Sequence, residues 1–260
     1  MSMVLVTGGT GKLGREVVSR LLADHHTTRI LSHKKAASVP QEVEVYYGDL
    51  TSGTGLGEAA AGVDAIIHCA SSPAYDTRMT DVEGTRRLLQ AAKESGSPHI
   101  IYISIVGIDQ SSYAYYQAKR DAETLIEQAQ LPWTILRTTQ FHDFVLHLIH
   151  EFKADTLPEV PVVGGMRFQS IDISEVADRL VTLMEQGPAG RVPDMGGPQI
   201  LTIEEMTETY LRIRGITATV RSEPPPGAQF SVFRSGINLT PDHAEGTITW
   251  ETFLRRLYDG

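Results

Sequence analysis

The 260-residue sequence is poor in several features that mark particular classes of protein. Its single cysteine, Cys69, excludes an intrachain disulfide framework and fits a reducing compartment. No uninterrupted apolar run approaches the ~20 residues that a membrane-spanning helix needs. The N-terminus lacks a basic region followed by an apolar stretch and a small-residue cleavage site, so no secretory leader is indicated. We therefore expect a cytoplasmic protein without a membrane segment.

Basic residues are also in deficit. Lysine and arginine total 23 against 32 aspartates and glutamates, which gives a net charge of −9. This balance draws the chain neither to nucleic acid nor to an anionic membrane, so we expect a small-molecule substrate as partner. With 41% hydrophobic and 21% charged residues, the chain can bury a large core, which excludes disordered and fibrous classes. Nothing in the composition indicates an oligomeric state.

Short apolar strands alternate with amphipathic helices over the first part of the chain. Residues 3–7 form an apolar run that stops at a cluster of glycines, and apolar residues then recur at helical spacing over 13–22. Strands that alternate with helices pair in parallel through right-handed crossovers. The sequence therefore predicts an α/β fold with a doubly wound parallel Rossmann sheet. Further strands are expected at residues 28–31, 42–47, 65–68, 99–104 and 133–136.

The alternation loosens after residue 140. We predict an NAD(P)-binding Rossmann core at 1–140, to which residues 169–197 return with a helix and a strand. Residues 141–168 and 198–260 are expected to form a small C-terminal substrate-binding lobe over the strand ends, where open α/β sheets bind ligands.

The glycine-rich segment Thr7-Gly-Gly-Thr-Gly-Lys-Leu-Gly14 follows the first strand and opens the first helix. Glycine lets the backbone approach a pyrophosphate, which then binds the unpaired N–H groups of the helix N-terminus. The bare pattern arises by chance about 0.2 times in such a chain, so its position carries the prediction. The alternative is a strand-to-helix turn with no ligand. The residues expected to bind the dinucleotide here are Gly8, Thr10, Gly11, Lys12 and Leu13.

The end of the second strand indicates which dinucleotide binds. An NAD-specific site places an acid there, whereas this chain has Ser32-His33-Lys34-Lys35. A hydroxyl and basic groups attract the 2′-phosphate that an acid would repel, so Ser32, His33 and Lys34 predict NADP(H). Lys12 is a second candidate for that phosphate. The alternative is that Lys34 and Lys35 are ordinary solvated charges.

A serine, a tyrosine and a lysine form a candidate catalytic group. Tyr115 and Lys119 lie four residues apart on one helix face, and Ser104 ends the preceding strand. A phenol of pKa about 10 must exchange a proton near neutrality, a shift of ~4 kcal/mol, and an ammonium ~4 Å away supplies about that much. We therefore expect Lys119 to lower the pKa of Tyr115. The alternative is a surface helix on which Tyr115 packs and Lys119 is solvated.

Together these motifs resemble the short-chain dehydrogenase/reductase superfamily. The resemblance covers about residues 3–200 and is closest to the atypical, extended NmrA-like NAD(P)-binding branch, which includes quinone and enone reductases. It is carried by the TGGTGKLG loop, Gly48-Asp-Leu50, Asp81-Val-Glu-Gly-Thr85, Ser104 and Tyr115-x-x-x-Lys119.

The resemblance implies a role for each of these residues. Ser104 would hold the substrate carbonyl, Tyr115 would exchange the proton, and Lys119 would hold the nicotinamide ribose as well as tune Tyr115. Extended members commonly have asparagine where Asp81 stands, and some atypical members have become dinucleotide sensors. The residues that the resemblance places along the cofactor are Asp49 and Leu50 beside the adenine, with Cys69, Ala70 and Ser71 farther along.

Residues 141–152 form an apolar, histidine-rich stretch that follows the strand at 133–136. Phe144 and Leu148, four residues apart, predict an apolar wall for a bulky acceptor, and His142 is expected to touch the substrate. The alternative is that this face packs on the sheet. No histidine spacing here matches a known zinc helix, so we expect no metal.

The function that these features favour is an NADPH-dependent reductase that transfers hydride to a carbonyl, quinone or conjugated enone of a bulky apolar substrate. Two alternatives stay open. One is a non-catalytic, NADP(H)-sensing regulator or assembly factor. The other is a redox-neutral nucleotide-sugar epimerase or dehydratase with tightly held NAD.

Overall fold

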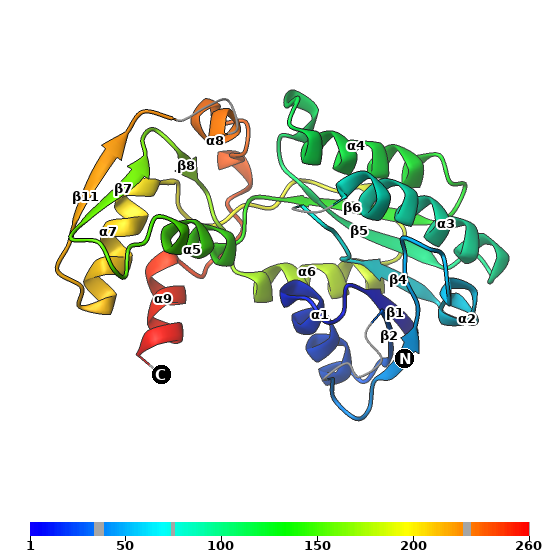
Figure 1. The fold of residues 1–260 in the computed structure, drawn as a ribbon. Coiled ribbons are helices and arrows are strands. Elements are labelled where there is room, and N and C mark those ends of the chain that lie inside the picture. The colour runs from blue at the N-terminus through cyan, green and yellow to red at the C-terminus, as the bar shows by residue number, and fades with distance from the viewer. Residues whose placement is uncertain (34–38, 74–75, 226–229, 260) are drawn as a thin grey trace. The chain divides into compact units, whose positions relative to one another are not determined.

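The computed structural model describes residues 1–33, 39–73, 76–225 and 230–259 (Figure 1). The chain divides into two compact units. The first unit comprises Met1–Ser104, Ser112–Arg137 and Ile173–Pro193, and the second comprises Ile105–Ser111, Thr138–Asp172 and Asp194–Gly260. The division expected from the sequence placed residues 105–111, 138–140, 169–172 and 194–197 with the Rossmann core, whereas the structure places them in the second unit.

A seven-stranded sheet forms the centre of the first unit. Its strand order is β3-β2-β1-β4-β5-β6-β9, and the pairings of β1 with β2 and β4, of β2 with β3, of β4 with β5 and of β6 with β9 are all parallel. The carboxyl ends of the strands therefore meet at one edge. The strands are β1 (Met3–Thr7), β2 (Thr27–Ser32), β3 (Glu44–Tyr47), β4 (Ala65–His68), β5 (His99–Ile105), β6 (Trp133–Thr138) and β9 (Gly190–Arg191).

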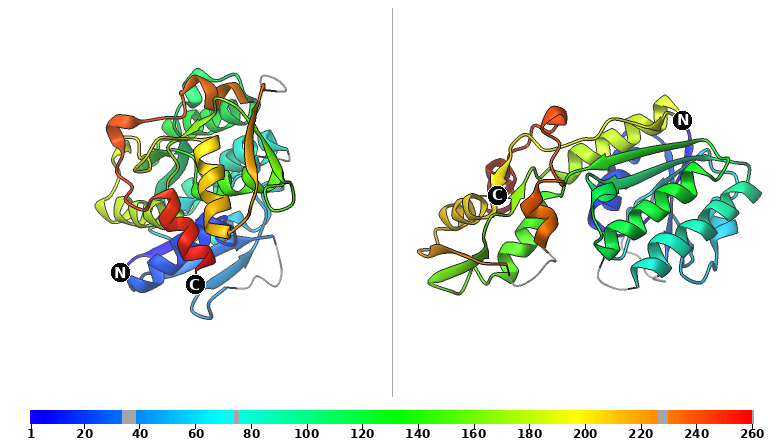
Figure 2. Two further views of the ribbon diagram at one scale, coloured as in Figure 1. Left: turned by 90° about the vertical axis from the view of Figure 1, so that its left-hand side faces the viewer. Right: turned by 90° about the horizontal axis from the view of Figure 1, so that it is seen from above.

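Helices cover both faces of this sheet, so the predicted doubly wound parallel fold is confirmed. Helices α1 and α6 pack together on one face, and α3 and α4 run side by side on the other (Figures 1 and 2). Each helix buries the apolar stripe that its sequence repeats every three or four residues. The helical elements are α1 (Lys12–Ala23), α2 (Leu56–Ala60), the π-helical η1 (Arg78–Glu83), α3 (Gly84–Glu94), α4 (Ala114–Glu127) and α6 (Ile173–Gln186).

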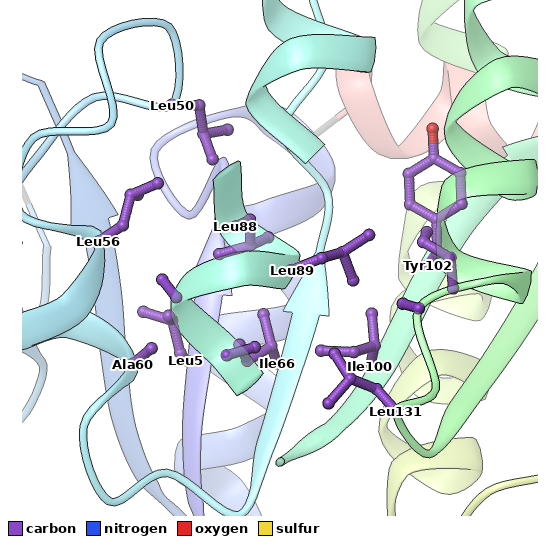
Figure 3. Packing of buried hydrophobic residues seen from close by; sticks show 14 of the residues in the cluster. Leu5, Leu50, Leu56, Ala60, Ile66, Leu88, Leu89, Ile100, Tyr102 and Leu131 are labelled. Carbon is purple, nitrogen blue, oxygen red and sulfur yellow. The ribbon is translucent and has the colours of Figure 1, made fainter. Parts of the chain in front are cut away.

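One apolar core of the first unit lies between the sheet and α2, α3 and α4. Leu5, Ile66 and Ile100 stand in register on β1, β4 and β5, so they form one row across the sheet. Leu88 of α3 packs over this row (Figure 3). Tyr102 lies at the margin of the cluster, and its hydroxyl points away from the labelled aliphatic side chains. The Tyr102 hydroxyl of β5 therefore lies toward the carboxyl edge of the sheet and outside the aliphatic packing.

The second unit has its own core and two small sheets. One sheet pairs β8 with β10 in antiparallel orientation, and the other pairs β7 with β11 in parallel. Large side chains from several elements, among them Phe168, Tyr210 and Trp250, fill the core. The elements are η2 (Ile108–Gln110), α5 (His142–Glu151), β7 (Glu159–Val163), β8 (Arg167–Phe168), β10 (Leu201–Thr202), α7 (Ile203–Arg214), β11 (Thr219–Glu223), α8 (Ser231–Ser235), η4 (Pro241–His243) and α9 (Trp250–Tyr258).

Neither a membrane-spanning helix nor a metal-binding cluster is found among the described residues. Among these residues, no helix is long and apolar enough to cross a bilayer. Within the same part of the chain, no group of three or more histidine, cysteine, aspartate or glutamate side chains is placed to hold a metal ion.

Candidate functional site

The glycine-rich loop between β1 and α1 leaves no room for side chains at Gly8 and Gly14. Gly8 has a left-handed φ of 71°, and its carbonyl accepts a hydrogen bond of 2.8 Å from the N–H of Gly11. A Cβ on Gly14 would lie only 2.1 Å from the Gly8 oxygen. Gly11 is the N-cap of α1, so no side chain caps the first amides of the helix. The loop therefore presents backbone N–H groups at a positive helix end, as a bound pyrophosphate requires.

The end of β4 lies against this loop. A Cβ on Gly8 would be 2.8 Å from the Ala70 nitrogen and 2.9 Å from the Cys69 carbonyl carbon. The Cys69 N–H also donates to the Thr7 carbonyl at 3.1 Å. The structure thus brings together two segments that the sequence analysis assigned to the cofactor. Burial raises the pKa of the Cys69 thiol to about 12, so the thiol is protonated at neutral pH.

The residues assigned to the adenosine half occupy different environments. Ser32 is buried, His33 is exposed, and Lys34 lies outside the described residues. The Asp49 carboxylate accepts hydrogen bonds from the N–H and hydroxyl of Thr51, at 2.7 and 2.8 Å, and so stabilises its own turn. Leu50 is buried in the apolar core (Figure 3). Contact of any of them with the adenosine stays a prediction.

Tyr115 belongs to a hydrogen-bonded chain at the carboxyl edge of the sheet. Its hydroxyl lies 3.0 Å from Ser71 Oγ, and Ser71 Oγ donates to Asp81 Oδ1 at 2.6 Å. The second oxygen of Asp81 accepts from the Ser72 N–H at 3.0 Å. Asp81 is almost fully buried, at 1% exposure, whereas Ser71 is exposed. The candidate proton donor is thereby coupled to a buried carboxylate through one hydroxyl.

Lys119 is buried close to these hydrogen-bonded residues, and it does not lower the pKa of Tyr115 as expected. Its Nζ donates to the Ile103 carbonyl at 2.8 Å and lies 4.1 Å from the centre of the Tyr102 ring. Burial lowers the pKa of Lys119, although nearby carboxylates oppose the shift. Burial raises the pKa of Tyr115 to about 12; the hydrogen bond with Ser71 opposes this rise, and the charge of Asp81 adds to it. The expected lowering is therefore wrong, because burial of the phenol dominates and the Lys119 ammonium bonds to the Ile103 carbonyl.

Two buried hydroxyls beside Lys119 have no hydrogen-bond partner among the described residues. They are the Oγ of Ser104, near the end of β5, and the phenol oxygen of Tyr102. Leaving such a group unpaired costs about 1–3 kcal/mol. A ligand oxygen that reached Ser104 would recover this free energy, which fits its assignment to the substrate carbonyl.

His68 connects the glycine-loop strand to the Asp81 segment, and the sequence analysis did not identify it. Its Nδ1 lies 2.6 Å from Thr7 Oγ1 and its Nε2 lies 2.9 Å from Thr85 Oγ1. Thr85 donates its own proton to the Asp81 carbonyl at 2.6 Å, so Nε2 must be the protonated nitrogen of the imidazole. Burial lowers the pKa of His68 to about 3, which keeps the ring neutral. The available signal was that polar Thr7 and His68 end two adjacent apolar strands.

The residues assigned to the substrate lie in the second unit. His142 is buried, with Nδ1 2.8 Å from Ser170 Oγ and Nε2 3.0 Å from the Ile248 carbonyl, so both ring nitrogens have internal partners. Phe144 is 36% exposed, and Leu148 is half-buried against the core of this unit. Contact of these residues with a substrate stays a prediction.

Comparisons with known proteins place this arrangement among dinucleotide-binding proteins. A family model described as NAD(P)H-binding matches residues 8–185. The chain is 27% identical to (4-alkanoyl-5-oxo-2,5-dihydrofuran-3-yl)methyl phosphate reductase of Streptomyces griseus subsp. griseus, over 87% of this chain and 84% of the reductase. It is 30% identical to photosystem II assembly factor Ycf39 of Synechocystis sp., over 85% of this chain and 70% of that factor. Triphenylmethane reductase of Citrobacter sp., solved with NADP(H), superposes with a TM-score of 0.79 at 21% identity, over 96% of this chain and 98% of that structure.

Proposed function

Because the chain belongs to the NAD(P)H-binding family, we propose that it is an NADPH-dependent reductase acting on a carbonyl, quinone or conjugated enone. The family assignment agrees with the resemblance to the short-chain dehydrogenase/reductases. One observation carries the proposal. The Tyr115 hydroxyl lies 3.0 Å from Ser71, which immediately follows the Ala70 that packs on Gly8 of the phosphate-binding loop. A phenol is therefore held beside the place where the loop would hold a dinucleotide.

The protonation state of Tyr115 suits reduction. When bound, NADPH supplies a hydride, which brings two electrons to the acceptor carbon. The acceptor oxygen then needs one proton. The Tyr115 phenol is protonated at neutral pH and so holds that proton, and its pKa of about 12 makes it a weaker acid than an ordinary phenol. Solvent returns a proton to the phenolate afterwards, so charge and atoms balance.

Other residues are assigned to binding and orientation. Ser104 would donate to the acceptor oxygen, which gives its buried hydroxyl a partner. Lys119 would turn from the Ile103 carbonyl toward the nicotinamide ribose. Ser32, His33 and Lys34 would favour the 2′-phosphate of NADPH over the free hydroxyl of NADH, since no acid stands at the end of β2.

The acceptor in this proposal is bulky and mostly apolar, and exposed aromatic surface in the second unit supports it. Phe144 keeps more than a third of its surface exposed, and its ring lies 5.8 Å from that of Phe233. Exposed aromatic surface gains about 25 cal/mol for each Å² that a ligand covers. The names of two similar proteins, a furanone-type phosphate reductase and a triphenylmethane reductase, support reduction of ring-containing acceptors.

A second candidate function is non-catalytic binding of NADP(H) by an assembly factor. The 30% identity to photosystem II assembly factor Ycf39 favours it. So does the burial of Ser104 and Lys119, both of which are at most 3% exposed. A protein that only binds the dinucleotide would have no need to expose either group.

Turnover measurements separate these functions. NADPH oxidation would be followed against a panel of quinones, cyclic enones and aldehydes, together with the near-ultraviolet absorbance of the purified protein. We expect oxidation with at least one ring-containing acceptor, and its loss in Tyr115→Phe with NADPH affinity retained. Tyr113→Phe, one residue before α4, is the matched control and should keep activity. Tight NADPH binding without turnover across the panel would favour the assembly factor, and a retained NAD would favour a redox-neutral enzyme.

A further inference from the structure

In the two hydrogen bonds that link Tyr115, Ser71 and Asp81, the donor and the acceptor of each bond are fixed. A carboxylate has no proton to donate, so Ser71 must donate its only proton to Asp81 across the 2.6 Å contact. Ser71 Oγ can then only accept from Tyr115, whose hydroxyl lies 3.0 Å away. The Tyr115 proton is therefore directed at Ser71.

We propose that Asp81 is a positioning residue that acts through Ser71 to hold the proton of Tyr115 and to keep the phenol un-ionised. This deepens the proposed function and rests on Tyr115 as its proton donor. A hydrogen bond from Ser71 lowers the pKa of Tyr115 only when Ser71 donates to the phenolate, and Asp81 competes for that same proton. The Asp81 carboxylate also repels a phenolate directly. Both effects keep Tyr115 protonated until an acceptor oxygen replaces Ser71 as its partner.

The other groups around Tyr115 do not supply the same effect. Tyr113 precedes α4 and Tyr102 lies on β5, and neither of these phenols is an acid or a cation that could take the place of Asp81. Lys119 is the cation one turn along α4, and its ammonium is bonded to the Ile103 carbonyl. Asp81, from η1, is thus the acid that faces the phenol in the described part of this site.

Asp81→Asn should reverse the donor and acceptor roles in these two hydrogen bonds. If its amide oxygen keeps the bond to the Ser72 N–H, its Nδ2 faces Ser71 and donates to it. Ser71 is then free to donate to Tyr115. Asp81→Asn thus removes the repelling charge and also gives the phenolate a hydrogen-bond donor, so Tyr115 should ionise at lower pH.

The test is a fluorine NMR titration of the full chain labelled with 3-fluorotyrosine, with the Tyr115 signal assigned by its absence in Tyr115→Phe. We expect Asp81→Asn to lower the pKa of Tyr115 by about one unit or more. In a Ser71→Ala background, the same substitution should shift the pKa of Tyr115 by about half as much or less, because Ser71 no longer links the two side chains. Asp121→Asn is the matched control. It removes an acid on α4 that pairs with Arg78 at the surface, and it should leave the Tyr115 signal unchanged.

Two results would overturn the inference. One is an Asp81→Asn titration that matches the unmodified protein, and the other is an equal shift with and without Ser71. If Asp81→Asn does not fold, Ser71→Ala alone decides, since Ser71 is exposed. A rise of about one unit in the pKa of Tyr115 would then mean that Ser71 donates to the phenol, against the proposal. These signals need no turnover, so an inactive protein with the expected shifts would contradict the proposed function and leave this inference standing.

Discussion

Thr7 and His68 stand opposite each other at the ends of two parallel strands, and their side chains share a 2.6 Å hydrogen bond. This contact joins the strand that leads into the glycine loop to the strand that leads to Ser71. His68 also bonds to Thr85, which bonds to the backbone of Asp81. The cofactor loop and the candidate proton donor are therefore held by one buried polar network. Their relative placement depends on an imidazole that must stay neutral.

The first prediction is a loss of stability in acid that depends on His68. The folded-state pKa of His68 is lowered to about 3, whereas the unfolded chain binds this proton near pH 6.5. Stability is therefore complete above pH 6.5 and is lost as the pH falls toward 3. Between pH 7 and 5 the His68 contribution to the free energy of unfolding should fall by about 2 kcal/mol. Burial also lowers the pKa of His99, which adds a loss in the same direction.

Urea unfolding at pH 7 and pH 5 measures this dependence. His68→Gln should be less stable than the unmodified protein at pH 7 but should lose about 2 kcal/mol less on acidification. His25→Asn, at an exposed position with a left-handed φ of 60°, is the control and should keep the full dependence. An unchanged pH dependence in His68→Gln would contradict the assignment.

The second prediction concerns the glycine loop. Alanine at Gly14 would place a methyl group 2.1 Å from the Gly8 oxygen, so the loop would have to open. We expect Gly14→Ala to lower the free energy of unfolding by about 1–3 kcal/mol and to weaken NADPH binding roughly tenfold. Gly57→Ala is the matched control, since nothing lies within 4 Å of a Cβ there and the residue is in helix α2. It should bind NADPH normally and be slightly stabilised. Equal affinities in the two variants would show that the dinucleotide binds elsewhere.

Most of the fold could be predicted from the sequence because the central strands are buried on both faces. Such strands appear as short apolar runs, as at Met3–Thr7 and Ala65–His68, and the glycines between β1 and α1 mark the first crossover. The placement of residues 105–111 in the second unit could not be predicted in this way. These residues continue directly from β5, and contacts that the sequence does not reveal, such as the close approach of Gly107 to Ile237, 130 positions along the chain, place them in the second unit.

The candidate site was less predictable, because its contacts join side chains from separate elements. Tyr115, Ser71 and Asp81 come from α4, the segment after β4, and η1, and no spacing rule connects them. The direction of the Tyr115 pKa shift was wrong for the same reason. Helical spacing places Lys119 one turn from Tyr115, but it does not show that the ammonium bonds to the Ile103 carbonyl on the strand below.

The third prediction is a preference for NADPH over NADH. The end of β2 has Ser32, His33 and Lys34 in place of an acid, and a charge-assisted contact to the 2′-phosphate contributes about 1.5–3 kcal/mol. That corresponds to a roughly 10- to 150-fold ratio of dissociation constants. Lys34→Asp should shrink or invert the ratio, whereas Lys93→Asp, on the exposed face of α3, should not. Equal dissociation constants in the unmodified protein would refute the preference.

The fourth prediction is that the acceptor is bulky and apolar, and that α5 helps to select it. Phe144 is 36% exposed and Leu148 is half-buried, so both have surface that a flat ring system could cover, at about 25 cal/mol for each Å². We would measure kcat/KM for a large aromatic quinone and a small polar aldehyde. The unmodified protein should favour the quinone, and Phe144→Ala should reduce that preference by roughly tenfold.

A matched control separates selection from packing. Val145 follows Phe144 on α5 but is fully buried, so Val145→Ala should lower the melting temperature and leave the ratio of the two kcat/KM values unchanged. If Phe144→Ala behaves in the same way, the exposed ring serves the packing with Phe168 and Phe233 and does not meet the substrate. A preference of the unmodified protein for the small aldehyde would remove the bulky acceptor from the proposal altogether, because burial of apolar area on α5 would then contribute nothing to selection.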